Sequence, residues 1–270
     1  METLKNSTET EFQPIELHGD KIHGKVNNLI QENKFSEAVE VVEQYIDAHS
    51  GSAPFMMVAA QAYKGIQDYK KESDCLSQLV SMSDKPRYSI LLAESLAQQN
   101  DFPQALKVLH KILDEADSMA PILFEVYKNM GNIYLKCGDI EAAEDSYNKA
   151  NGMNSQDENL MVNYGVLAIQ KGEYDNAKQR FTDVLAMNNS SDLAWVGMAL
   201  VHRAHGDFDL SRACLLRGLD DNPYNKLAIS NYYQWSHQDN IDTTSEIMES
   251  YLEAYPGDVE MQNLSNSMSH

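Results

Sequence analysis

The chain has 270 residues, of which 43% are hydrophobic and 23% are charged, and its formal net charge at pH 7 is −20. This length is sufficient to bury a large core, and no apolar run is long enough to cross a membrane. The strong negative charge argues against nucleic acid or anionic lipid as a partner, because both carry negative charge themselves.

Residues 1–18 are polar, and we expect them to form a flexible segment. They lack the basic start and the apolar stretch of a secretion signal. The cysteines, Cys75, Cys137 and Cys214, are far apart and odd in number, so we expect no disulfide framework. Both observations predict a reduced, cytoplasmic protein.

From residue 19 to residue 256 the sequence repeats itself with a period of about 34 residues. Each unit is predicted to form an amphipathic helix, a short turn and a second amphipathic helix. The units are expected to start at Gly19, Ala53, Pro86, Phe124, Glu158, Asp192 and Asn225. The turns are expected to begin at Asn33, Gln67, Asn100, Gly138, Gly172 and Gly206, where Gly or Asn is suited to ending a helix.

Two positions in each unit carry mostly small side chains, as expected where paired helices cross closely. The first carries Val26, Ala60, Ala93, Gly131, Gly165 and Ala199, and the second carries Ala38, Glu72, Ala105, Ala143, Ala177 and Ser211. Together with aromatic and proline residues in register, this pattern resembles the tetratricopeptide-repeat family. The resemblance implies an all-α fold, a right-handed α-solenoid of about seven helix-turn-helix repeats over residues 19–256.

The chain departs from the family pattern at several places. Glu72 in the second repeat and Tyr232 in the last repeat stand where small residues are expected. Extra residues in the stretch 114–121 are expected to lengthen either a helix or a turn between the third and fourth repeats. Residues 257–270 are expected to form a short cap or tail, because such stacks usually end in a polar capping element.

In this family the first helix of each repeat lines a concave groove that binds ligands. Transferred to this sequence, the resemblance implies a peptide-binding set in repeats four to six. Its members are Lys128, Asn129, Asn132, Lys136, Val162, Asn163, Val166, Ile169, Leu193, Val196, Leu200 and Arg203.

Each residue type in this set has its own expected role. The basic residues would engage acidic groups, the asparagine amides the ligand backbone, and the aliphatic side chains an apolar anchor such as a partner helix. For both the charged and the apolar members, an alternative interpretation requires no ligand. The basic residues are alternatively ordinary solvated side chains, and the aliphatic ones alternatively pack inside the superhelix or under a terminal segment.

Three residues also match part of a site found in some family members. Lys128, Asn132 and Asn163 correspond to the first three positions of a clamp that holds the carboxylate of a chaperone C-terminus. The next two positions, basic in the clamp, are here Leu193 and Gly197. The clamp is incomplete, so a peptide with both polar and apolar groups is the expected ligand.

The sequence contains no constellation of residues typical of a catalytic site. His202 and His205 have the spacing of two metal ligands on one helix, but they lack the glutamate and the spacing of a zinc-protease helix. We expect these histidines to be structural. The sequence therefore predicts a protein that is not an enzyme and has neither a cofactor nor a metal site.

The leading hypothesis is a non-enzymatic, cytoplasmic adaptor that binds a peptide or helix of another protein in its groove. An alternative is a cytoplasmic secretion or assembly chaperone that masks apolar segments of a client. A third is self-association through the last repeat, around Ile247, Met248, Tyr251 and Leu252. The identity of the partner cannot be read from the sequence.

Overall fold

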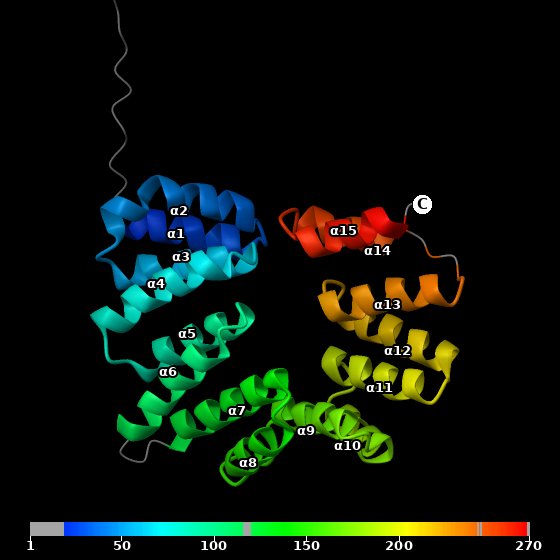
Figure 1. The fold of residues 1–270 in the computed structure, drawn as a ribbon. Helices are drawn as coiled ribbons and strands as arrows, with labels where there is room; N and C mark the ends of the chain where they lie inside the picture. Colours follow the sequence, from blue (N-terminus) through cyan, green and yellow to red (C-terminus); the bar gives the residue numbers. More distant parts are fainter. Residues whose placement is uncertain (1–18, 116–119, 242, 244, 269–270) are drawn as a thin grey trace, which may run out of the picture.

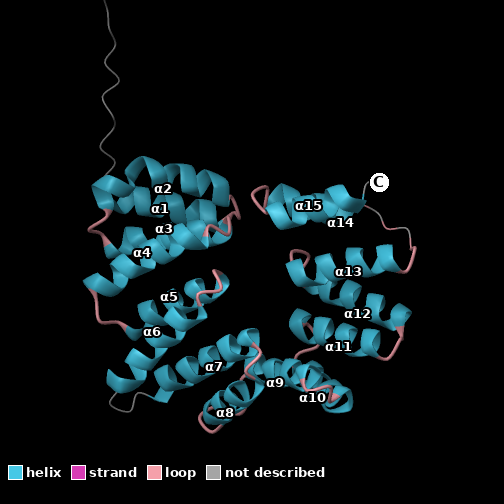
Figure 2. Cartoon of the chain, in the orientation of Figure 1, coloured by secondary structure: helices cyan, strands magenta, loops and turns pink. Residues whose placement is uncertain are grey.

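The computed structural model describes residues 19–115, 120–241, 243 and 245–268, and within them the regular elements are helices (Figures 1 and 2). The predicted flexible segment, residues 1–18, lies outside the described residues. The helices are α1 (Gly19–Gln31), α2 (Phe35–His49), α3 (Ala53–Gly65), α4 (Tyr69–Met82), α5 (Pro86–Gln98), α6 (Phe102–Glu115), α7 (Ala120–Cys137), α8 (Ile140–Asn151), α9 (Glu158–Gln170), α10 (Tyr174–Met187), α11 (Asp192–Ala204), α12 (Phe208–Asp221), α13 (Lys226–Gln238), α14 (Glu246–Ala254) and α15 (Val259–Met268).

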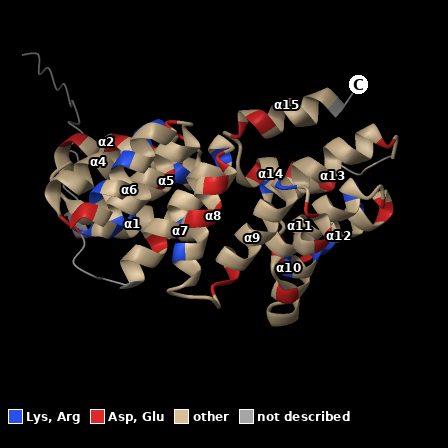
Figure 3. Ribbon diagram, turned by 60° about the horizontal axis from the view of Figure 1, so that its bottom comes forward, with Lys and Arg blue, Asp and Glu red and all other residues tan. Residues whose placement is uncertain are grey.

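Consecutive helices pair into hairpins, and each hairpin packs against the next. The odd-numbered helices up to α13 are the first helices of the repeats, and they face the middle of the molecule in Figure 1. The even-numbered helices form the outer layer. This arrangement confirms the predicted all-α solenoid of helix-turn-helix repeats. Acidic residues are distributed along much of the solenoid rather than gathered at one point (Figure 3).

The turns inside the hairpins follow one backbone pattern. Their first residues have a positive φ, at Asn33 (58°), Gln67 (62°), Asn100 (61°), Gly138 (79°), Gly172 (75°) and Gly206 (82°). Glycine and asparagine tolerate this left-handed conformation better than most residues. An aspartate side chain then caps the second helix in several turns. Asp68 accepts a hydrogen bond from the Lys71 backbone N–H at 3.0 Å, and Asp139 accepts one from that of Ala142 at 3.1 Å. The predicted turns are thereby confirmed.

The close crossing of paired helices explains why small residues recur at these positions. A Cβ atom added at Gly165 would lie 2.5 Å from Cε1 of Phe181, closer than real carbon contacts allow. One added at Gly131 would collide with the ring of Tyr147 in the same way. Both aromatic side chains are fully buried. The small residues therefore make room for large rings on the second helices, and the interior is closely packed.

Two boundaries differ from the expected ones. The fourth repeat begins at Ala120, before the expected Phe124, so α7 is the longest helix and takes up part of the extra sequence. Residues 116–119 lie outside the described part. The last repeat begins one residue late because Asn225 acts as the cap: its side chain accepts a hydrogen bond from the Ala228 backbone N–H at 2.9 Å. Within the C-terminal segment, the short helix α15 spans Val259–Met268.

The solenoid closes into a ring, which the repeat pattern did not predict. The Gln67 side chain, in the α3–α4 turn, donates a hydrogen bond from Nε2 to Asp258 Oδ2 at 2.9 Å, across 191 residues of sequence. Lys226 Nζ lies 3.3 Å from Gln67 Oε1 and 3.0 Å from Asp258 Oδ1. The rings of Phe35 and Tyr255 stack with centroids 5.9 Å apart. The α14–α15 turn thus touches the first two repeats (Figure 1).

Among the described residues, none of the helices is both long enough and apolar enough to cross a membrane.

Candidate functional site

A hollow of about 480 Å³ opens on the inner face of repeats two to five. Six helices contribute to it, α3, α4, α5, α7, α8 and α9. Its lining consists of Lys64, Glu72, Glu94, Ser95, Ala97, Gln98, Asn129, Asn132, Ile133, Leu135, Lys136, Tyr147, Asn163, Val166 and Gln170. The predicted peptide-binding set contributes Asn129, Asn132, Lys136, Asn163 and Val166 to this lining.

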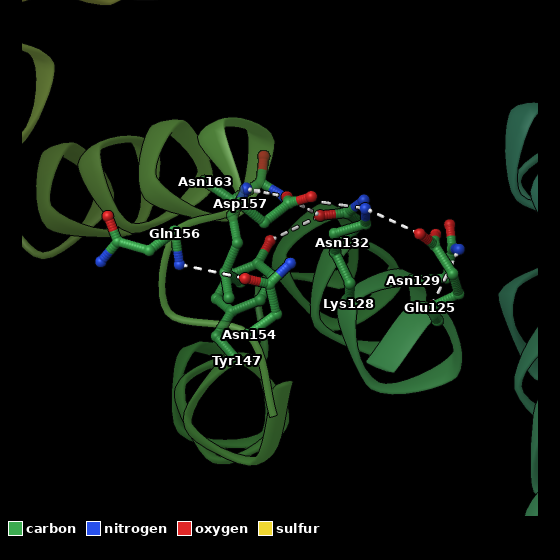
Figure 4. A network of polar contacts seen from close by, with 10 residues as sticks. Glu125, Lys128, Asn129, Asn132, Tyr147, Asn154, Gln156, Asp157 and Asn163 are labelled. Carbon is green, nitrogen blue, oxygen red and sulfur yellow. Dashed lines mark hydrogen bonds and ion pairs between the residues drawn. The ribbon is translucent and has the colours of Figure 1, made fainter. Parts of the chain in front are cut away.

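Three polar side chains in the hollow orient one another (Figure 4). Tyr147 donates a hydrogen bond from Oη to Asn132 Oδ1 at 2.8 Å, and Asn163 donates one from Nδ2 to the same oxygen at 2.8 Å. Burial raises the pKa of Tyr147, so its hydroxyl stays protonated and remains a donor. The Nδ2 group of Asn132 and the Oδ1 atom of Asn163 have no partner among the described residues. A donor and an acceptor side by side can bind a peptide backbone.

Lys128 is already neutralised by its own chain. Its Nζ lies 3.3 Å from Glu125 and 3.6 Å from Asp157, and 4.7 Å from the centroid of the Phe124 ring (Figure 4). The lysine side chain is 12% exposed. Beside it, Asn129 donates a hydrogen bond to the Glu125 carbonyl at 3.0 Å and is itself buried. Lys128 therefore joins α7 to the start of α9, and an acidic ligand group would have to displace these carboxylates.

Lys136 differs from Lys128 because no carboxylate pairs with it in the described part of the chain. Its Nζ donates a hydrogen bond to Gln98 Oε1 at 2.9 Å, across the gap between α7 and α5. The surrounding protein partly desolvates the ammonium group and lowers the pKa of Lys136. This lysine remains exposed at the edge of the hollow.

The predicted aliphatic residues fall into two groups. Val162 and Val196 are 5% and 2% exposed and pack in the core, so we exclude them from the ligand contacts. For these two valines, packing inside the superhelix is the correct alternative. The remaining four stay at least partly exposed: Val166, Ile169, Leu193 and Leu200.

Arg203 lies outside the hollow and has a structural environment. Its guanidinium pairs with Asp239 at 2.6 Å and donates a hydrogen bond to Gln238 Oε1 at 3.0 Å. It also lies over the rings of Phe208 and Trp235, at 4.5 Å and 5.3 Å from their centroids. These contacts join α11 to α13. Like the Lys128 ammonium, the Arg203 guanidinium already has an ion-pair partner beyond its own repeat.

Ten of the fifteen lining residues are absent from the predicted set, and two of these ten, Tyr147 and Glu72, come from second helices. Tyr147 lies on α8, and the signal in the sequence is its register with Phe181 of the next repeat. Glu72 lies on α4 and is 4% exposed; Ser95 Oγ lies 2.9 Å from its Oε2. Burial raises the pKa of Glu72. The signal there was a charged residue at a position occupied elsewhere by small ones.

The histidines of the H-x-x-H pair have contacts within their own repeat. His202 Nδ1 lies 3.4 Å from Asp207 Oδ2, and His205 Nδ1 lies 3.0 Å from the Val201 carbonyl. Within the part of the chain that the structure describes, no group of three His, Cys, Asp or Glu side chains could hold a metal ion.

The surface predicted for self-association is partly internal. Met248 and Tyr251 are each 2% exposed and belong to the core of the last repeats, whereas Ile247 and Leu252 are partly buried against it. We therefore exclude Met248 and Tyr251 from a surface that a second copy would contact.

Sequence comparisons connect the chain to known repeat proteins. Family models described as the tetratricopeptide repeat match residues 124–157 and 162–226. The chain is 26% identical over 172 residues to intraflagellar transport protein 70A of Xenopus laevis, covering 63% of this chain and 25% of that protein. It is 24% identical over 217 residues to the tetratricopeptide repeat protein 30 homolog of Drosophila melanogaster, covering 78% and 32%. The chain thus spans a quarter to a third of the length of these relatives.

Solved structures show the same fold at low sequence identity. The crystal structure of the APC/C hetero-tetramer Cut9–Hcn1 matches 96% of this chain and 51% of that chain, with a TM-score of 0.59 and 15% identity. That of PilW, a type IV pilus biogenesis factor, matches 78% and 96%, with a TM-score of 0.59 and 13% identity. At these identities the likeness concerns the fold alone.

Proposed function

We propose that this chain, a tetratricopeptide-repeat protein, is a non-enzymatic adaptor that binds a peptide or helix of another protein on the inner face of its ring. The observation that carries the proposal is that the Nδ2 group of Asn132 and the Oδ1 atom of Asn163, both in the hollow, have no partner among the described residues. They offer one donor and one acceptor to a polypeptide backbone. The relatives named for intraflagellar transport support a role in a protein assembly and a cytoplasmic location.

The surroundings of these amides suit a ligand of mixed polarity. Val166 lies in the same hollow, and Ile169, Leu193 and Leu200 continue the apolar surface along α9 and α11. Leu193 is 43% exposed. A partner helix or an extended segment would bury these side chains while the asparagines bind its polar groups. Lys136 is the basic residue of the predicted set that stays available to a ligand.

The proposal is tested with the double variant Asn163→Ala, Leu200→Asp. It removes Asn163 Oδ1, the acceptor for a backbone N–H of the ligand, and places a charge within the apolar surface. Capture of the partner from native lysate should therefore be lost. Circular dichroism should show unchanged helicity. The matched control, Asn176→Ala with Leu210→Asp, alters exposed residues of the outer helices and should capture the partner normally. Normal capture by the first variant would place the binding site elsewhere.

A second candidate is a chaperone that masks apolar segments of a client. The partly exposed aliphatic residues favour it, because they would cover a client's apolar surface without reading its sequence. An aggregation assay separates the two functions. A chaperone suppresses aggregation of an unfolded client, whereas an adaptor forms a stoichiometric complex with a folded partner.

A further inference from the structure

We propose that the part of the hollow lined by Glu72 and Glu94 binds a cationic side chain, lysine or arginine, of the bound polypeptide, with these two carboxylates as the receiving groups. The inference rests on the proposed function for the polypeptide nature of the ligand. It adds the charge of the residue that enters the hollow.

The hydrogen bonding of Glu72 is incomplete. Ser95 Oγ lies 2.9 Å from Glu72 Oε2 and 3.1 Å from the Tyr69 carbonyl, and a hydroxyl has one proton to donate. The other carboxylate oxygen, Oε1, has no donor among the described residues. The glutamate is nevertheless only 4% exposed to solvent. A buried carboxylate without adequate partners is costly, and a cation supplied from outside would compensate it.

A second carboxylate in the hollow also favours the binding of a cation. Glu94 lies on α5, lines the same hollow and is half-buried, and the described residues give it neither an ion pair nor a hydrogen bond. Its charge acts together with burial in raising the pKa of Glu72. A ligand ammonium or guanidinium placed between the two would interact with both.

The basic residues of the hollow compensate the buried Glu72 carboxylate only in part. Lys64 on α3 and Lys136 on α7 are both exposed, whereas Glu72 is buried. The charge of Lys64 acts to lower the pKa of Glu72, but burial outweighs it and the pKa stays raised. Neither lysine forms an ion pair with a described carboxylate. An acidic ligand group in this part of the hollow would add a third negative charge beside Glu72 and Glu94. The difference in burial therefore favours a cation.

The rest of the lining suits a long basic side chain. Ile133, Leu135 and Val166 are apolar and would contact the aliphatic stem, as lysine and arginine stems commonly pack on apolar surface. The amides of Asn132 and Asn163 are then placed to bind the backbone on either side. One residue of the ligand would thus meet all three kinds of lining.

The experiment uses four small probes with the full chain: the N-acetyl amides of lysine, arginine, norleucine and glutamate. Binding is followed by NMR through the side-chain amide signals of Asn132 and Asn163. The lysine and arginine probes should give saturable shifts, and the norleucine and glutamate probes should bind more weakly. Glu72→Gln should weaken binding of the basic probes by about tenfold, the loss of one charge-assisted contact.

Two further variants keep the result interpretable. Glu72→Ala restores the small residue typical of the position, and it should fold and also lose the basic probes. Glu40→Gln changes an exposed acid on α2 and should bind them like the wild type. Preference for the glutamate probe, equal binding of all four, binding of none, or unchanged affinity in Glu72→Gln would each overturn the inference.

The outcomes separate this inference from the proposed function. If partner capture survives Asn163→Ala with Leu200→Asp while the basic probes still require Glu72, the groove adaptor site is wrong and the cation site stands. If capture is lost in that variant while Glu72→Gln binds the probes normally, the cation site is wrong and the adaptor site stands.

Discussion

Individual side chains of the hollow and of the predicted binding set have environments that their place in the repeat does not specify. The asparagines could be predicted as inward-facing because they occupy first-helix positions. The pairing of Lys128 with Asp157, and of Arg203 with Asp239, could not, because each partner comes from a neighbouring repeat whose distance depends on the packing. Glu72 departs from the repeat pattern in the sequence, but only the structure shows that it is buried.

Glu72 should make the stability of the protein depend on pH. Its pKa is raised by burial from the ordinary value of 4.5, so between that value and the raised one the folded state binds more protons than the unfolded state. The free energy of unfolding should therefore fall as pH rises through this interval. Glu72→Gln should remove this fall and be more stable than the wild type at alkaline pH, by about 1 kcal/mol. Urea denaturation at several pH values measures it, and a variant that is less stable throughout would contradict it.

Helices and turns were predicted more reliably than side-chain environments. Five of the expected repeat starts coincide with helix starts, at Gly19, Ala53, Pro86, Glu158 and Asp192. Local sequence determines these boundaries through turn residues and periodic apolar positions. The start of the fourth repeat could not be placed from sequence, because the extra residues were compatible with a longer helix and with a longer turn.

Substituting a crossing glycine tests the packing between paired helices. Gly165→Ala places a Cβ against the buried ring of Phe181, and the free energy of unfolding should fall by about 1–3 kcal/mol. Gly24→Ala is the matched control, because nothing lies within 4 Å of its added Cβ. The control should be stabilised by up to about 1 kcal/mol through helix propensity. Thermal denaturation compares the two, and an equal effect would show that the crossing tolerates a larger residue.

Ring closure is a property of the whole molecule, because it depends on the small rotation between successive repeats. Those rotations add up over many hairpins, so no local pattern predicts where Gln67 and Asp258 will lie. Once they meet, the Asp258 carboxylate stays ionised: burial alone would raise the pKa of Asp258, but hydrogen bonds from Lys226 and Tyr251 outweigh it and lower the pKa. This contribution to stability is present above the ordinary value of 3.8 and is lost as pH falls through the lowered one.

Gln67→Ala should open the ring without disturbing the local cap of α15. It removes the contacts with Asp258 and Lys226 but leaves the bond between those two residues. Small-angle scattering should then give a larger radius of gyration, and hydrogen exchange should increase in α14 and α15. Asn100→Ala alters the same turn position, also at positive φ, with no partner across the ring among the described residues. A variant as compact and as protected as this control would mean that the glutamine does not hold the ring closed.

Closure also restricts how this architecture can vary. In an open stack, a hairpin can be gained or lost with little effect on the others, because each contacts only its neighbours. Here the number of hairpins between Gln67 and Asp258 is fixed, since inserting or deleting one would rotate the two residues out of reach of each other. Duplication and loss of single units, the ordinary route by which such arrays change length, should be much less tolerated in this segment than substitution within it.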